Sequence, residues 1–241
     1  MAKLRSTLKQ IPWSLALRAA ALAVIWLAAP TWLFVALALL AYFVPLFQPS
    51  RFALPFVATL VLSALTPPSV WLMPLVGVLF FAILGAKDLI LIDRAGAYET
   101  SVLVLVFLST LAFFSRCTTL EHASAFAWSF VVACVIFILL RAFGEYLATS
   151  DDAVRTHSSP RRRLLAWGVT ALATWQVSLA ALALPLGRFA QSAMVFATVA
   201  VLAGIELDYL RSRLDRPRLL AYAGTFTVLL GAILFSNQWG L

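Results

Sequence analysis

The residues of this 241-residue sequence that are best suited to chemistry are a few charged side chains at the edges of long apolar runs. Glu206 and Asp208 lie close to Arg211, and carboxylates beside arginines could hold a divalent metal and a diphosphate. Asp88 and Arg94 could join them in a site for a lipid-linked phosphate. Metal binding needs several converging carboxylates, and two at a helix end are usually only hydrated. We therefore predict no metal site and no cofactor. The catalytic candidates are Asp88, Arg94, Glu206, Asp208 and Arg211.

Three further charged residues could bind a ligand. Arg18 is the one charge inside an early apolar run, about 10 Å deep at a rise of about 1.5 Å per residue, where it could bind an anionic substrate or a lipid phosphate. A side chain that snorkels to the interface is the favoured interpretation. Arg141 and Glu145 are four residues apart and so share a helix face, where they could form a gate or a proton-linked pair. A structural ion pair that closes the helix end is favoured there.

Thr170, Thr174 and Ser178 recur at every fourth residue, with Gln176 close by, and so predict a polar stripe along one helix. Such a stripe could line the path of a solute, with Gln176 as a ligand-binding candidate. Small hydroxylated residues also let membrane helices pack closely, and this is the interpretation we favour.

Other kinds of chemistry have little support in the sequence. Cys117 and Cys134 form no C-x-x-C motif, and we expect no disulfide between them. His122 and His157 fall in predicted loops on opposite sides, which gives no histidine relay. The sequence has no phosphate-binding loop, no H-E-x-x-H and no G-x-S-x-G motif. Its basic residues form no face of a module that would bind nucleic acid.

The composition places the chain in a membrane. Hydrophobic residues make up 63% of the sequence and charged residues 12%, against roughly 45–50% and 25% in soluble proteins. The predicted fold is all-α, a polytopic transmembrane helical bundle in the cytoplasmic (inner) membrane. A chain of this length has room for about nine spans of about 20 residues and for no sizeable soluble domain.

Nine apolar runs are the predicted spans. They cover residues 11–29, 31–47, 52–65, 70–86, 101–115, 123–143, 164–184, 189–207 and 219–235. Residues 87–100 contain too short an aliphatic run to cross a bilayer and are predicted to lie in the headgroup region. We expect one membrane domain over residues 1–241, with a possible division into parts 1–145 and 164–241 that are joined by a basic loop at 146–163.

The distribution of basic residues predicts the orientation. The segment 156–163 ends in three consecutive arginines, which cannot be left in hydrocarbon. With nine spans, the loops on that side contain fourteen Lys and Arg residues, and the other side has only Arg116 and Arg188. The positive-inside rule then gives a cytoplasmic N-terminus and an outside C-terminus. Five tryptophans are expected in interfacial belts, namely Trp13, Trp32, Trp71, Trp167 and Trp239.

Three functions remain open. The net charge of +8 is expected to draw anionic lipid headgroups to the cytoplasmic face. Because ionisable groups inside the spans are scarce, the favoured function is a non-enzymatic transport or assembly subunit that packs against a partner membrane protein or a second copy. The alternatives are a small membrane enzyme that acts on a lipid-linked phosphate at the cytoplasmic interface, and a small-solute permease with Arg141, Glu145 and Gln176 along its route.

Overall fold

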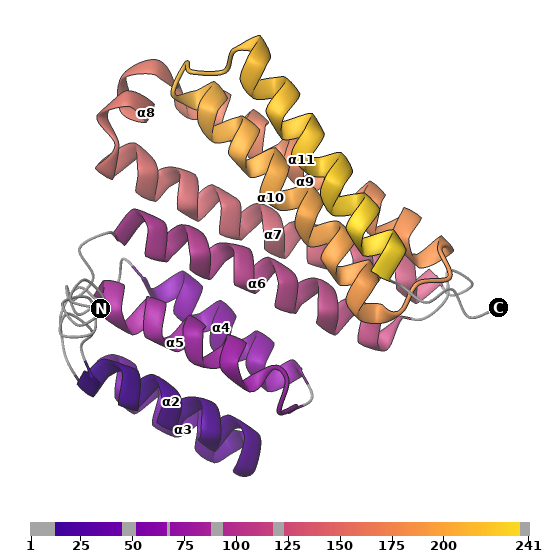
Figure 1. The fold of residues 1–241 in the computed structure, drawn as a ribbon. Helices are drawn as coiled ribbons and strands as arrows, with labels where there is room; N and C mark the ends of the chain where they lie inside the picture. The colour runs from indigo at the N-terminus through magenta and orange to yellow at the C-terminus, as the bar shows by residue number, and fades with distance from the viewer. Residues whose placement is uncertain (1–12, 45–51, 67, 88–93, 118–122, 237–241) are drawn as a thin grey trace, which may run out of the picture. The chain divides into compact units, whose positions relative to one another are not determined.

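A computed structural model describes residues 13–44, 52–66, 68–87, 94–117 and 123–236 of the chain (Figure 1). These segments are almost wholly α-helical, and no strand occurs in them. The predicted all-α fold is therefore confirmed. The helices in chain order are α2 (Trp13–Ala28), α3 (Thr31–Phe43), α4 (Ala53–Leu65), α5 (Met73–Lys87), α6 (Arg94–Arg116), α7 (Ala123–Ser150), α8 (Asp152–His157), α9 (Pro160–Ala183), α10 (Arg188–Leu210) and α11 (Arg216–Ser236).

Five of these helices are long and apolar enough to cross a membrane, namely α6, α7, α9, α10 and α11. Four shorter apolar helices, α2 to α5, have between 13 and 16 residues. At a rise of about 1.5 Å per residue the shortest of them are about 20 Å long, less than the roughly 30 Å of hydrocarbon in a typical bilayer. Each of the nine predicted spans overlaps one apolar helix, while the number of crossings and the orientation stay predictions. Helix α6 begins at Arg94, so the last residues of the segment 87–100, which was predicted to lie in the headgroup region, belong to a helix that is long and apolar enough to cross a membrane.

The chain forms two compact units, residues 1–104 and 105–241, and the boundary between them falls within α6. The segment 146–163, which the sequence suggested as a linker, belongs to the second unit. Whether the chain divides in the membrane into parts before and after that segment stays a prediction.

Unit 1 is built around the pairing of α2 with α5. Small residues let these helices approach closely, because a Cβ added at Gly77 would lie 3.5 Å from the Cβ of Ala23. The indole N–H of Trp26 donates to the backbone oxygen of Ser63 over 2.7 Å, which ties α2 to α4. The ring of Tyr42 stacks on Phe56 with centroids 3.9 Å apart, which joins α3 to α4. Apolar burial and aromatic contact thus hold together helices that are too short to be stable alone.

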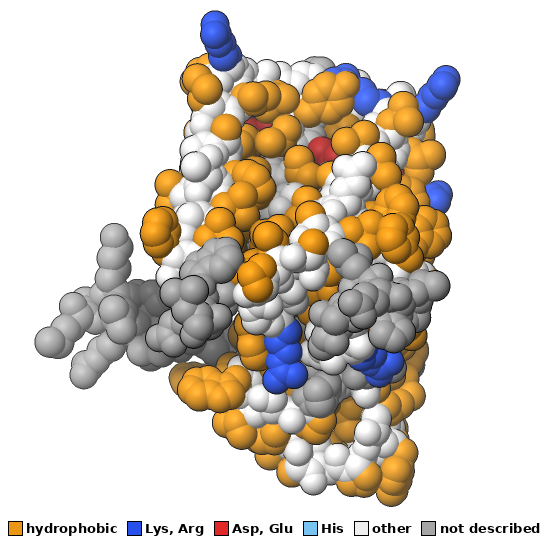
Figure 2. All heavy atoms as spheres, turned by 90° about the vertical axis from the view of Figure 1, so that its right-hand side faces the viewer, with side chains coloured by type: hydrophobic (Ala, Val, Ile, Leu, Met, Phe, Trp, Pro, Cys, Tyr) orange, Lys and Arg blue, Asp and Glu red, His pale blue; other side chains and the backbone are white. Residues whose placement is uncertain are grey.

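In unit 2 the helix α9 packs between α7 and α10, and α10 also packs against α11 (Figure 1). The buried face of α9 consists mainly of small and hydroxylated residues, which include Thr170, Thr174 and Ser178. This confirms that the predicted stripe lies in a helix contact. Helix α11 has no buried residue, so its apolar side chains remain on the surface of the unit. Figure 2 shows hydrophobic side chains over most of the visible face and few charged ones.

The arginine triplet lies in a helix and not in a loop as predicted. The side chain of Ser159 accepts a hydrogen bond from the backbone N–H of Arg162, and Pro160 occupies the first position of α9. This combination of an N-cap serine and a first-turn proline starts a helix. Helix α7 also continues to Ser150, beyond the expected end at residue 143. The predicted basic loop is thereby reduced to α8 and its short connections.

The tryptophans expected in interfacial belts differ in exposure. Trp13, Trp32 and Trp71 are strongly exposed, as interfacial residues would be. Trp167 instead has only 1% of its surface exposed. Its placement in an interfacial belt was wrong, because its ring packs inside unit 2. Trp239 lies outside the described residues.

Candidate anion-binding site at the arginine-rich end of unit 2

One end of unit 2, here called the arginine-rich end, combines residues from α7 to α11. It comprises Arg141, Arg155, Arg161, Arg162, Arg163, Arg211, Arg213, Arg216 and Arg218. Two contacts join the segments that contribute them. The guanidinium of Arg211 pairs with the carboxylate of Asp151 at 2.9 Å, and that of Arg162 lies 4.0 Å from the ring centroid of Tyr209. The two predicted arginine-rich loops therefore meet at the same end of the unit.

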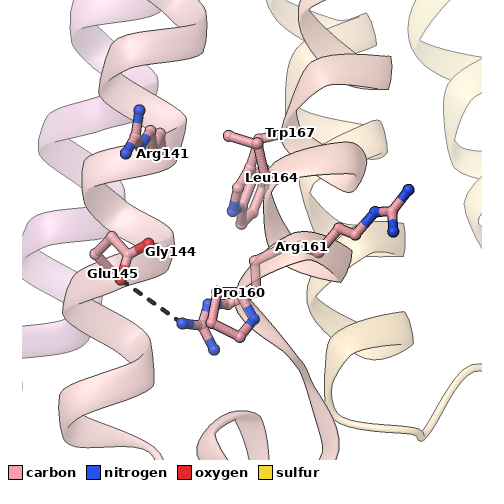
Figure 3. Close-up of a pocket in the computed structure, with 8 residues that line it drawn as sticks. Arg141, Gly144, Glu145, Pro160, Arg161, Leu164 and Trp167 are labelled. Atoms are coloured by element: carbon pink, nitrogen blue, oxygen red, sulfur yellow. Dashed lines mark ion pairs between the residues drawn. The ribbon is translucent and has the colours of Figure 1, made fainter.

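The three arginines of the triplet diverge because consecutive helical residues are rotated by about 100°. Arg162 stacks on Tyr209 of α10, a cation–π contact. Arg163 turns toward α7, where its Nη2 lies 3.6 Å from Glu145 Oε2. Figure 3 shows Arg161 extending away from α7. The first turn of α9 thus presents positive charge in three directions, and it contains no acidic residue that would offset the positive end of the helix dipole.

A pocket of about 230 Å³ opens between α7 and the start of α9. Figure 3 shows its lining, which comes from α7 with Arg141, Gly144 and Glu145 and from α9 with Leu164 and Trp167. The residues that line it are Arg141, Gly144, Glu145, Pro160, Arg161, Arg163, Leu164 and Trp167. The volume suffices for a group the size of a phosphate.

Arg163 is the most enclosed cation of this pocket, with 9% of its surface exposed. Its Nη1 donates to the backbone oxygen of Ser158 over 3.0 Å, which fixes the guanidinium against the turn before α9. Its Nε is buried and has no hydrogen-bond partner among the described residues. Glu145 offsets the charge only weakly, because the side chain of this glutamate is 58% exposed and the ion pair is long.

Trp167 contributes a second unused donor. Its indole Nε1 is buried and lacks a hydrogen-bond partner in the described part of the chain. Figure 3 shows the ring directed from α9 toward α7, on the side of Arg141 and Gly144. Gly144 makes this approach possible, because a Cβ at that position would collide with Nε1 of the ring. An unpaired buried N–H is costly, so an acceptor that reached this Nε1 would remove that cost.

The chemistry of the pocket is that of an anion site. Guanidinium and indole groups donate hydrogen bonds and cannot accept them. Arg141 and Arg163 bring two positive charges against the one exposed carboxylate of Glu145. Such an excess of donors suits a group with several anionic oxygens, and arginines bind phosphate in this manner.

The catalytic candidates near the end of α10 do not converge. Glu206 points to α9, where its Oε1 accepts a hydrogen bond from Thr170 over 2.5 Å. Asp208 points to α11, where it pairs with Arg218 at 3.2 Å and accepts from Tyr222 over 3.0 Å. Arg211 reaches Asp151 in the connection between α7 and α8. No group of three metal-ligating side chains occurs in the described segments.

The remaining predicted residues are scattered. Asp88 lies outside the described residues, and Arg94 begins α6 with a side chain that is not described. Arg18 is exposed on α2, as a snorkelling residue would be. Gln176 is exposed on α9, away from the buried stripe of hydroxyl groups. Arg141 and Glu145 line one pocket, but their predicted ion pair does not form, because Glu145 pairs with Arg163.

Sequence reasoning missed the two residues that give the pocket its unusual donor, Gly144 and Trp167. A glycine within a long apolar helix is a signal of close approach, but the residue that approaches it is 23 positions later and on another helix. A comparison of the chain with family models, with characterised proteins and with solved structures finds no match.

Proposed function

We propose that the protein is a non-enzymatic integral membrane component, a transport or assembly subunit, that binds the phosphate of an anionic lipid headgroup in the pocket between α7 and α9. The observation that supports this most is the buried, unpartnered indole N–H of Trp167 beside the enclosed guanidinium of Arg163. A phosphate oxygen would accept a hydrogen bond from the indole N–H, and the negative charge of the phosphate would compensate the positive charge of the guanidinium.

An amphiphilic ligand fits the surroundings better than a free anion. Leu164 lines the pocket, and Ile138 is exposed three residues before Arg141, on the same side of α7. A lipid bound with its phosphate at the pocket would place its acyl chains along these side chains, so that apolar surface of both is covered. The bound headgroup would also screen the repulsion among the arginines and thereby stabilise the arginine-rich end.

The enzyme alternative is less well supported by the same geometry. Hydrolysis or transfer of a phosphate would require acidic or basic groups close to the bound phosphate. In the described part of the chain Glu206, Asp208 and Arg211 each contact a different helix or loop. A headgroup in the pocket would meet donors and one glutamate that already pairs with Arg163.

Lipid retention by the purified protein tests the proposal. The protein in detergent is titrated with phosphatidylglycerol or with phosphatidylcholine of the same acyl chains, and bound lipid is counted by native mass spectrometry. Phosphatidylglycerol should bind more tightly. Trp167→Phe, which keeps an aromatic ring and removes the N–H, should weaken its binding about tenfold or more, because a hydrogen bond to a charged group is worth roughly 1.5–3 kcal/mol. Arg163→Gln should weaken it by about fivefold or more, from about 1 kcal/mol per basic residue near an anionic surface.

Arg188→Gln is the matched control, because Arg188 begins α10 at the opposite end of unit 2. Loss of the positive charge at residue 188 should leave the affinity for phosphatidylglycerol unchanged. The proposal is wrong if the arginine-rich and opposite-end variants lose phosphatidylglycerol equally, or if Trp167→Phe retains it fully. Inorganic phosphate is added as a competitor, and displacement of the lipid by millimolar phosphate would identify a free anion as the ligand and contradict the lipid assignment.

A further inference from the structure

Glu206 is an acidic residue inside a candidate spanning helix that the phosphate pocket does not use. It lies one turn before the end of α10 and has 8% of its surface exposed. Its Oε1 accepts from the hydroxyl of Thr170 on α9, and its Oε2 is buried without a hydrogen-bond partner in the described residues. The carboxyl group is thus held firmly at one oxygen, while the other faces no donor.

The charged groups around it are engaged elsewhere. Directly after α10, Arg211 pairs with Asp151, which follows α7. On α11 Arg218 pairs with Asp208, and Tyr222 donates to the same carboxylate. On α9 the guanidinium of Arg162 stacks on Tyr209. Within the described part of the chain, no positively charged side chain contacts Glu206.

An ionised carboxylate in this place would be unstable. Removing a charge from water without a partner costs several kcal/mol, and an apolar membrane environment makes the cost larger. A neutral carboxylic acid avoids that cost, because its carbonyl oxygen can accept from Thr170 and its O–H can remain at Oε2. The geometry around both oxygens therefore favours the protonated form.

We infer that Glu206 is a proton-binding site between α9 and α10, which takes up and releases a proton when the protein works. Intramembrane carboxyl groups of this kind serve proton relays in transporters.

Thr174 and Ser178 continue from Thr170 at one-turn intervals on the same buried face, and the hydroxyl of each donates a hydrogen bond to the backbone of the preceding turn. Their free lone pairs extend the polar stripe along α9 from Glu206 toward the opposite end. The inference supports the transport branch of the proposed function and is independent of the lipid pocket.

A hydrophobic carbodiimide tests this inference in the full-length protein. The acid O–H of a protonated carboxyl adds across one C=N bond of dicyclohexylcarbodiimide, its proton passes to nitrogen, and the product rearranges to a stable N-acylurea with no leaving group. Carboxylates are not modified in this way. Peptide mass spectrometry should find the adduct at Glu206 at neutral pH, with a yield that falls as the pH is raised. Exposed carboxyls such as Glu145 should remain unmodified at neutral pH, and Glu206→Gln should abolish the adduct.

Two matched threonine variants separate a specific role from general packing. Thr170→Val removes the donor that helps to stabilise the ionised form, so modification should persist to a higher pH, by about one unit or more for the loss of a hydrogen bond to a charged group. Thr174→Val removes a hydroxyl one turn away that bonds only to the backbone of α9, and it should leave the pH profile unchanged.

Infrared difference spectra between neutral and alkaline pH provide a second measurement that needs no reagent to reach the site. A carboxylic C=O band that disappears in Glu206→Gln and on alkalinisation supports the inference. Absence of both the adduct and the band in folded protein overturns it. Equal shifts for Thr170→Val and Thr174→Val overturn it as well. If Glu206→Gln still retains phosphatidylglycerol, lipid binding does not depend on the proton-binding site, and failure of one proposal can be distinguished from failure of the other.

Discussion

Asp151 shows how one side chain at the arginine-rich end serves two structural purposes. Its Oδ1 accepts from the backbone N–H groups of Ala153 and Val154 and so caps α8, while Oδ2 pairs with Arg211, the residue that follows α10. Burial alone would raise the pKa of Asp151, but the hydrogen bond and positive charge of Arg211, together with the two backbone donors, outweigh burial and leave the pKa below its ordinary value. The folded state therefore favours the ionised form.

This pKa direction predicts how the stability depends on pH. The contribution of Asp151 is complete above the ordinary aspartate pKa of about 4, and it is lost as the pH falls from there through the lower pKa of the folded state. The melting temperature of purified protein in detergent should decline over this range. Asp151→Asn keeps a capping side chain but removes the charge, so its melting temperature should lie below that of the native protein at pH 7 and should converge with it in acid.

Asp151→Ala loses the cap as well and should melt lower than Asp151→Asn at every pH, by about 1 kcal/mol of stability. Identical pH profiles for the native protein and Asp151→Asn would contradict the account of this carboxylate.

At the scale of elements, the contact between α7 and α9 depends on the absence of a side chain at Gly144. Gly144→Ala would drive a methyl group into the indole of Trp167, and overpacking of this kind typically costs about 1–3 kcal/mol. We expect a melting temperature several degrees lower and weaker retention of phosphatidylglycerol.

Gly168→Ala is the matched control, because no atom lies within 4 Å of the Cβ position at Gly168. That variant should be neutral or slightly stabilising, since alanine favours a helix by up to about 1 kcal/mol. A larger loss of stability in Gly168→Ala than in Gly144→Ala would refute the packing that is described for α7 and α9.

The start of α9 shows what could have been predicted at this scale. Ser159 and Pro160 are the ordinary signals of a helix N-terminus, and they would have placed the arginine triplet in the first turn. The three consecutive arginines instead predicted a loop, because arginines are not expected to continue an apolar run. They are accommodated since each leaves the helix in a different direction, onto Tyr209, toward Glu145 or away from α7.

At the scale of the whole molecule, the apolar runs of the sequence predicted every apolar helix of the described segments. Hydrophobic length is a local property, so it can be recognised without a structure. The site could not be predicted in this way. Gly144 with Trp167 and Thr170 with Glu206 are contacts between helices, and apolar runs on several helices are compatible with many pairings. The unpartnered donors and acceptors become visible only when the pairing is known.

The claim on which the account depends is that the arginine-rich end and the opposite end of unit 2 lie on opposite sides of a membrane. Ser150 ends α7 at the arginine-rich end, and Ser236 ends α11 after three further long helices; both are exposed. Ser150→Cys and Ser236→Cys, each in a chain with Cys117→Ala and Cys134→Ala, are treated with a membrane-impermeant maleimide in intact bacterial cells and after permeabilisation. We predict that Ser236→Cys reacts in intact cells and that Ser150→Cys reacts only after permeabilisation. Reaction of Ser150→Cys in intact cells, or the same accessibility at both positions, would contradict a cytoplasmic phosphate-binding end.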